Sequence, residues 1–467
     1  MAGAAVACAI APDGSANDAN CQIELTGRLI VPSGSSYSNN AFSFMAVIGA
    51  IQTTGQFNNL TSFVVTGPGT IVNGAAGVTG AVFSNDTVDG SILNVGRITN
   101  QAGAVWSNTN GAGMGQFGIL NATTGASLVN DGVGTQFFNA GPSALTTPPP
   151  AGTIGATTID AATATNSNGA LIYNKLGATL TNTNAATFLN TSGATLTNDG
   201  ATVVNQAGGL VSNQGGALIA NILTNQGPAS AIVNTDAGTN FTNSARITND
   251  GAGTTLTNQS AAQLTNTGAA ARIDNTGGAT LVNGASITNE NGAVIASSAV
   301  LNNQIGEFGG TVINRLGGQI SNAAGGKINN IGSTSSIVNA ATLTNDGAGT
   351  ALVNSFRATL SNDGGQFTNR NGATVTNRLA GQIVNINGGQ LTNTGTGALI
   401  ANDAGLTNSG TGSLVSNTNA ATMINTGTLT TSNSAALSNA ASIINQGTGV
   451  LVKQTQGIVF NGGTITN

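Results

Sequence analysis

The sequence feature that most constrains the fold is a short unit, ending in asparagine, that recurs every seven or eight residues. It is clearest at residues 177–182 (Gly-Ala-Thr-Leu-Thr-Asn) and returns at residues 185–190 and 193–198. In each unit an apolar residue stands between two polar ones, which is the two-residue period of a strand and not the spacing of an amphipathic helix. The Gly, Ala, Asn and Asp residues between units tolerate the backbone of sharp corners. Each unit therefore predicts a strand of about four residues followed by a corner.

Strands this short cannot bury their apolar faces alone, so they must stack in a coil where each strand pairs with its counterpart one coil later. Three steps of the repeat close at 24 residues, as from Asn369 to Asn393. Some steps are only six residues long, and two of them, from Asn243 to Asn249 and from Asn339 to Asn345, are followed by a step of nine, as a closed coil would require. We therefore predict an all-β chain folded as a parallel β-solenoid (β-helix), three-sided and with about 24 residues per coil. A two-sided coil of about 16 residues is the alternative.

The recurring asparagine is predicted to form a ladder along the coil axis. Stacked side-chain amides can hydrogen-bond to one another and to the corner backbone. The alternative is that asparagine is simply a favourable turn residue. The ladder is favoured because asparagine keeps one phase of the repeat while the residues around it vary. The ladder candidates are Asn182, Asn190, Asn198, Asn205, Asn213, Asn249, Asn258, Asn345, Asn369, Asn377, Asn385 and Asn393.

The amino-acid composition limits which kinds of molecule the protein can be expected to bind. Charged residues make up 6% of the 467 residues, against roughly 25% in ordinary soluble domains. The net charge is -5 and the basic residues are scattered singly, so nucleic-acid binding has no support. Hydrophobic residues make up 39%, which argues against disorder. A nearly uncharged surface of Thr, Ser and Asn offers little electrostatic repulsion to self-association.

Catalytic chemistry has few candidates in this sequence. Histidine is absent, which excludes Ser-His-Asp and Cys-His mechanisms and the usual zinc sites. Asp199, Asp250 and Asp346 stand in Asn-Asp-Gly corners with no second carboxylate nearby in sequence. Acids brought together by coiling are the remaining route to glycoside cleavage. We expect a protein that is not an enzyme, with no catalytic residues, no metal and no cofactor.

Changes in composition and in the regularity of the repeat predict five segments along the chain. Residues 1–21 form an N-terminal segment in which Cys8 and Cys21 are predicted to form a disulfide, two free thiols being the alternative. Residues 22–75 are assigned to an N-terminal cap that runs into the first strands, and residues 76–139 to irregular coils. Residues 140–168, rich in Pro, Thr and Ala, are assigned to a loop or linker, because a central strand rejects proline. Regular repeats follow over residues 169–467, and no stretch is predicted to span a membrane.

The Gly-Ala-Thr-Leu-Thr-Asn units, the coil-like period and the shortage of charge resemble the β-helical passenger regions of large bacterial exoproteins. These are the autotransporter and two-partner-secretion adhesins of the filamentous haemagglutinin type. The resemblance covers residues 70–467. It implies a right-handed β-solenoid that is displayed outside a bacterial cell and serves adhesion, biofilm or surface-layer roles.

We therefore expect a secreted structural protein, extracellular or at the cell surface, whose copies join head to tail into a filament or matrix. Its main partner would be itself, with cell-surface glycans or other matrix components as further partners. The alternative is a monomeric adhesin stalk whose ligand contacts lie on the 140–168 loop or the N-terminal region. A third hypothesis, in which the protein is an enzyme, is a polysaccharide-degrading β-helix.

Overall fold

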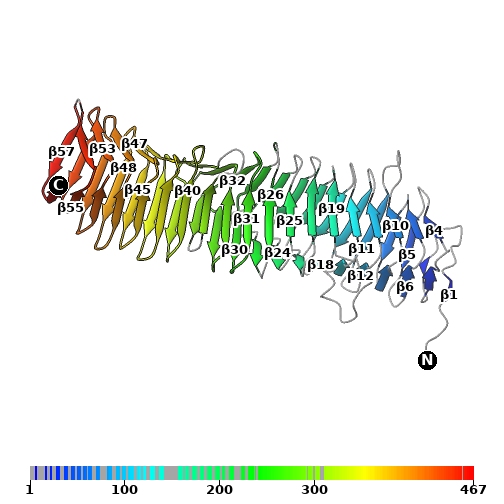
Figure 1. Cartoon of the computed structure of the whole chain (residues 1–467). Helices are drawn as coiled ribbons and strands as arrows, with labels where there is room; N and C mark the ends of the chain where they lie inside the picture. The colour runs from blue at the N-terminus through cyan, green and yellow to red at the C-terminus, as the bar shows by residue number, and fades with distance from the viewer. Residues whose placement is uncertain are drawn as a thin grey trace. The chain divides into compact units, whose positions relative to one another are not determined.

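The computed structural model describes residues 240–467, except 292, 298–299, 305–309 and 455. Before residue 240 it describes the strands β1 to β28 and five residues beside them, at positions 81, 104, 230, 235 and 237. Every regular element among the described residues is a β-strand of two to five residues, from β1 (Val6–Ala7) to β58 (Thr464–Thr466). Figure 1 shows that the strands within each part of the chain stack beside one another, coil upon coil. The prediction of an all-β chain is confirmed.

The chain divides into two compact units. Unit 1 comprises Met1–Val233 and Gly238–Phe241, and unit 2 comprises Asn234–Ala237 and Thr242–Asn467. Unit 2 contains most of the described side chains. The following paragraphs therefore concern unit 2 until unit 1 is taken up by itself.

One coil of unit 2 consists of β45 (Gln366–Arg370), β46 (Thr374–Asn377) and β47 (Gln382–Ile386). Each strand pairs in parallel with the third strand before it and the third strand after it; β45, for example, pairs with β42 (Thr342–Asp346) and β48 (Gln390–Thr394). Three parallel sheets result: sheet A contains β45, sheet C contains β46 and sheet B contains β47. Successive ladder asparagines in one sheet are 23 or 24 residues apart in this region. The predicted three-sided parallel β-solenoid is confirmed, and the two-sided alternative is wrong.

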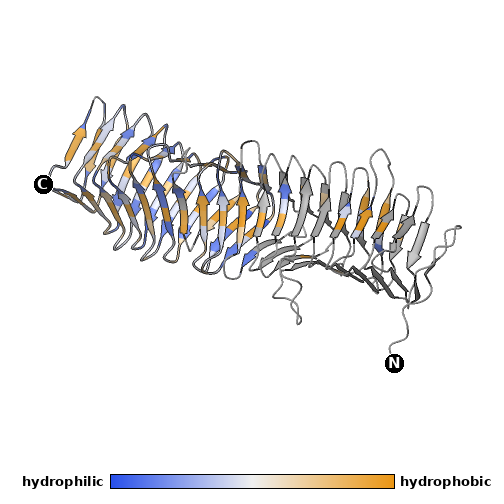
Figure 2. Ribbon diagram, turned by 45° about the vertical axis from the view of Figure 1, so that its right-hand side comes forward, coloured by the Kyte–Doolittle hydropathy of each residue, from blue (hydrophilic) through white to orange (hydrophobic). Residues whose placement is uncertain are grey.

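The core of each coil is built by alternation along the strands. In β45, Phe367 and Asn369 point inward and are buried, while Thr368 between them faces outward. Phe367 lies in register with Leu343 of the preceding coil and Leu391 of the following one, so each sheet contributes a column of apolar side chains to the interior. Figure 2 shows the resulting alternation of hydrophobic and hydrophilic segments along the strands of unit 2. Burying one side chain of this size contributes about 1.5–3 kcal/mol.

Asn369 shows how a ladder is built. Its side chain is fully buried. Its Nδ2 donates to Oδ1 of Asn393 (2.8 Å) and to the backbone carbonyls of Ala373 (2.9 Å) and Leu399 (3.0 Å). Its Oδ1 accepts from Nδ2 of Asn345 (2.8 Å). One amide therefore joins its own corner, the coil before it and two strands of the coil after it.

The ladder prediction is confirmed and extends to three columns, one in each sheet. Every hydrogen bond between ladder amides in unit 2 runs in the same direction, with Nδ2 donating to Oδ1 of the next coil toward the C-terminus. Asn182, in unit 1, is buried, and the side chains of the other unit 1 candidates lie outside the described ones. The predicted residues that take part in these bonds are Asn249, Asn258, Asn345, Asn369, Asn377, Asn385 and Asn393.

In unit 2, two ladders contain residues other than asparagine: Ser297 in sheet A, and Thr431 and Lys453 in sheet B. In sheet A, Nδ2 of Asn275 donates to Oγ of Ser297 (3.3 Å). In sheet B, Thr431 follows Asn408, and its buried hydroxyl has no hydrogen-bond partner among the described residues. An unsatisfied buried hydroxyl costs about 1–3 kcal/mol. The ladder of sheet B is therefore weakest at Thr431.

Replacing Thr431 by asparagine is expected to raise the free energy of unfolding of unit 2 by about 1 kcal/mol. The new amide can accept from Nδ2 of Asn408 and removes the unpartnered hydroxyl. Urea unfolding followed by circular dichroism measures the change. The control is Ser438→Asn at an outward position of sheet A, which is expected to change stability by less than about 0.5 kcal/mol. Equal effects of the two substitutions would contradict a specific role of the ladder.

Unit 1 uses the same parallel pairing of every third strand. The rings of Phe57, Phe83 and Trp106, from successive strands of sheet B, stack in its interior. The ring centroids of Phe57 and Phe83 are 4.4 Å apart, and those of Phe83 and Trp106 are 4.1 Å apart. This column of aromatic rings takes the place that aliphatic side chains hold in unit 2.

Three segment predictions concern unit 1. Residues 156–160 and 163–167, which were assigned to the 140–168 loop, form β19 (Ala156–Asp160) and β20 (Thr163–Ser167) and pair with coil strands on both sides, so that assignment is too long. Residues 141–155 lie outside the described residues. In the predicted cap, β4 (Arg28–Val31) already pairs with β7 (Ala50–Thr53) in the manner of the coils. Cys8 lies outside the described residues, and so does the predicted disulfide with Cys21.

Candidate functional site

The candidate site lies at the corner that leads from sheet C to sheet B, which we call the C–B corner. Between β46 and β47 this corner holds residues 378–381. In the next two coils it holds only two residues each, 403–404 and 426–427, and it lengthens again to residues 446–449. Two short corners between two longer ones leave a notch that extends over two coils, about 10 Å along the axis. The strands that flank the short corners are β49 (Leu399–Asn402), β50 (Gly405–Ser409), β52 (Thr422–Asn425) and β53 (Thr428–Ser432).

Glycine makes the short corners possible. A Cβ on Gly427 would collide with the backbone of Ala404 in the neighbouring coil. A Cβ on Gly405 would collide with the end of the Gln382 side chain. The coils of β49 and β52 can therefore approach closely at this corner only because Gly427 has no side chain, whereas the flexible end of Gln382 could move away from a Cβ at position 405.

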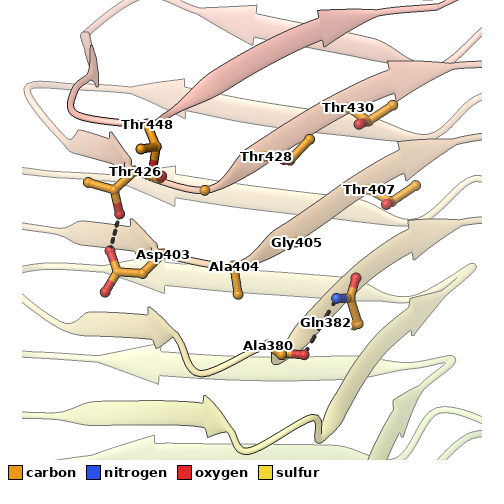
Figure 3. A pocket seen from close by; sticks show the side chains of 11 residues that line it. Ala380, Gln382, Asp403, Ala404, Gly405, Thr407, Thr426, Thr428, Thr430 and Thr448 are labelled. Atoms are coloured by element: carbon orange, nitrogen blue, oxygen red, sulfur yellow. Dashed lines mark hydrogen bonds between the residues drawn. The ribbon is translucent and has the colours of Figure 1, made fainter.

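The notch has a volume of about 550 Å³ and is open to solvent. Its walls are mostly polar, and in Figure 3 the side chains of Thr407, Thr428 and Thr430 lie along two neighbouring strands. Asp403 supplies the one charged group of the lining. The lining residues are Ala380, Gln382, Asp403, Ala404, Gly405, Thr407, Thr426, Gly427, Thr428, Thr430 and Thr448.

Only part of this polar lining is used in internal hydrogen bonds. The hydroxyl of Thr426 donates to Oδ1 of Asp403 (2.6 Å), and the hydroxyl of Thr448 donates to the carbonyl of Thr426 (3.0 Å). Nε2 of Gln382 makes a long contact of 3.5 Å with the carbonyl of Ala380. Within the described part of the chain, the hydroxyls of Thr407, Thr428 and Thr430 and Oδ2 of Asp403 have no protein partner. These four groups remain available to a ligand.

The notch is bordered by a ridge formed by the two long C–B corners that precede it. Phe356 and Leu379 are each 54% exposed and adopt left-handed backbone conformations, with φ of 54° and 50°. The ridge is continuous, because the amide of Arg357 donates to the carbonyl of Leu379 (3.2 Å). Arg357 and Arg378 make no ion pair with any described residue. Large exposed apolar side chains on a strained backbone are features that accompany binding sites.

Ion pairs among the described residues lie away from the notch. Asp274 accepts from Arg246 (2.8 Å) and Arg272 (2.5 Å), and is 6% exposed between them. The other two pairs, Arg315–Glu290 and Arg370–Asp346, are each 2.8 Å and join neighbouring coils. The arginine of each pair is about half-exposed, and surface pairs of this kind contribute about 0–1 kcal/mol each.

The groups that line the notch can form hydrogen bonds with a ligand. The notch contains one carboxylate, whereas glycoside cleavage uses a pair. Among the described residues, no group of three acidic or cysteine side chains is placed to hold a metal ion. What the notch offers is a concave surface of hydroxyl, amide and carboxylate groups beside apolar side chains.

The sequence analysis did not identify this notch, and none of its ladder candidates lines it. A signal exists in the sequence. The step from Asn402 to Asn408 is six residues, and one coil later the step from Asn425 to Thr431 is again six. Two short steps at the same corner predict an indentation once the corner of each step is known.

Within the described residues, no helix has the length and hydrophobicity to span a membrane. No protein-family description matches the sequence, and no curated protein matches it. Among solved structures, the chain is similar to the TibC-catalyzed hyper-glycosylated TibA55-350 fragment, with 10% sequence identity and a TM-score of 0.21. That match covers 95% of this chain and 100% of the other. The three parallel sheets of the chain form the β-solenoid that the resemblance to adhesin passenger regions implies, while membership of that family stays a prediction.

Proposed function

We propose that the protein is an extracellular structural β-solenoid, without enzymatic activity, whose copies join end to end. The observation that carries this proposal is the common direction of the three ladders. Each coil of unit 2 offers amide donors on its C-terminal side and amide acceptors on its N-terminal side. Two such faces are complementary only when they meet head to tail. Added copies would then continue the three parallel sheets. At the ladder positions, the first strands that reach them hold Asn17, Ile23 and Val31, so only sheet B presents an asparagine there.

The outward side chains of Ile458 and Phe460 support contact with a second copy. Ile458 and Phe460 are 42% and 58% exposed, whereas the paired positions one coil earlier hold Ala436 and Ser438. Val450 is also exposed. Exposed apolar side chains of this size mark interaction surfaces, and the shortage of charge lets identical copies approach. The strands concerned are β54 (Ala436–Asn439), β56 (Val450–Lys453) and β57 (Ile458–Asn461).

The double substitution Ile458→Thr and Phe460→Ser is expected to lower the association constant at least tenfold. Each apolar side chain contributes about 1.5–3 kcal/mol when it is buried in a contact. Sedimentation velocity over a concentration series measures the change. Thr392→Ser, at an outward position of β48, is the matched control and should associate like the unchanged chain. Monomers at all concentrations, or equal association of both variants, would reject self-association through this surface.

A monomeric adhesin stalk is the second candidate function, and the notch at the C–B corner is the observation that favours it. A scaffold needs no concave site with unused hydrogen-bonding groups, whereas an adhesin does. In this function the coils hold the notch away from the cell and a surface glycan or matrix component occupies it. Location outside the cell is part of both candidates and is supported by the sequence resemblance to secreted β-helical adhesins.

A further inference from the structure

We infer that the notch at the C–B corner binds an uncharged oligosaccharide that lies across the two short corners. This inference deepens the adhesin-stalk function and rests on it for its biological setting. The argument for sugar binding uses only the residues at the notch. Sugar binding by the purified protein can therefore be tested whether or not the copies associate.

The unused polar groups match a ligand rich in hydroxyls. Thr407 and Thr430 are paired in register on neighbouring strands, so their outward hydroxyls stand about 5 Å apart along the axis. Thr428 stands opposite Gly405, where no side chain blocks access. A threonine hydroxyl both donates and accepts, as a sugar hydroxyl does, while Oδ2 of Asp403 accepts. A saccharide can therefore satisfy these groups.

The apolar groups match the other face of a sugar ring. Ala380 and Ala404 line the notch, and Leu379 stands on the ridge next to Ala380. The C–H groups of a pyranose ring can pack against these side chains while its hydroxyls face the threonines. Phe356 extends this surface by one coil, beside Leu379. The notch and ridge together provide room for more than one sugar unit.

Charge decides between uncharged and acidic sugars. No lysine or arginine lines the notch, and its single charged group is the carboxylate of Asp403. A uronate, sialate or sulfate placed there would face this carboxylate without a compensating cation. Arg357 and Arg378 belong to the ridge and not to the lining. Uncharged sugars are therefore favoured over acidic ones.

The test is a panel of immobilised oligosaccharides of two to four units, in uncharged and in sialylated or sulfated forms. Titration calorimetry with the best uncharged binder then gives the affinity. Thr407→Val and Thr428→Val keep the side-chain shape and remove one hydroxyl each, and each is expected to weaken binding about tenfold. Thr376→Val, at an outward position of β46, is the matched control and should bind normally. Asp403→Asn is expected to admit acidic sugars that the unchanged notch rejects.

Circular dichroism verifies that each variant keeps the fold. The inference is overturned if no uncharged oligosaccharide binds at millimolar concentration, or if the valine variants bind as well as the control. It is also overturned if acidic sugars bind best and Arg378→Gln abolishes that binding. Sedimentation of the same samples tests end-to-end association separately from sugar binding. If the protein binds sugar but sediments as a monomer, the end-to-end proposal is rejected and the oligosaccharide inference stands.

Discussion

Replacing Asn369 by aspartate is expected to destabilise unit 2 by about 3–5 kcal/mol at neutral pH. The Asn369 amide is fully buried and donates to Oδ1 of Asn393 and to two backbone carbonyls. A carboxylate cannot donate, so three acceptor oxygens would surround a buried negative charge. Because a solenoid is stabilised by contacts between neighbouring coils, the damage should be greatest in the coils around residue 369.

The same substitution should make stability depend on pH. Burial disfavours the charged form, so the pKa of the introduced carboxyl is raised in the folded state above its unfolded value of about 3.9. The folded state then binds more protons than the unfolded state. The free energy of unfolding of the variant therefore falls as the pH rises above about 4, and it stops falling once the pH exceeds the pKa of the carboxyl in the folded state. Urea unfolding between pH 4 and 8, followed by circular dichroism, measures the slope.

Thr368→Asp is the matched control, since it places the same charge one residue away on the outward face. It is expected to cost at most about 1 kcal/mol and to add no comparable loss above pH 4. If Asn369→Asp were as mild as this control, the ladder would not be a main support of the coils.

Replacing Phe367 by alanine is expected to destabilise unit 2 by about 3–5 kcal/mol. Phe367 is 1% exposed and stands in register between Leu343 and Leu391. Its removal leaves a cavity that the hydrogen-bonded strands around it cannot close, because their spacing is set by the backbone. Native-state hydrogen exchange should show increased opening in β42, β45 and β48.

Thr368→Ala controls for the loss of a side chain in the same strand, and should cost less than about 1 kcal/mol. Equal costs for Phe367→Ala and Thr368→Ala would mean that the apolar columns contribute little and that hydrogen bonds alone hold the coils. Together with Asn369→Asp, these variants separate the inward apolar, inward polar and outward positions of one strand.

The sequence predicts most of this fold because each physical requirement recurs in every coil. Thr-Leu-Thr-Asn patterns place one apolar residue and one asparagine on the same face, and residues such as Asn369 keep that phase throughout. The number of ladders is harder to predict from the sequence. Asn369, Asn377 and Asn385 follow one another along the chain, yet each stands in a different sheet and stacks on a partner 23 or 24 residues away.

The notch could not be predicted for a related reason. A six-residue step, such as that from Asn402 to Asn408, shortens one corner, but the sequence alone does not say which of three corners it shortens. Similar steps stand at other corners, and two of them, from Asn439 to Asn445 and from Asn461 to Asn467, follow one another at the corner from sheet A to sheet C. The ridge residue Leu379 carries no repeat signal, because its exposure follows from the long corner that precedes the short ones.

Electron microscopy of the full chain over a concentration series tests the central proposal, end-to-end association, most directly. The account predicts filaments in which the coils of one copy continue into the next, and separate particles for the Ile458→Thr, Phe460→Ser variant. Separate particles of the unchanged chain at every concentration would contradict it. The adhesin stalk, with its oligosaccharide notch, would then become the leading function.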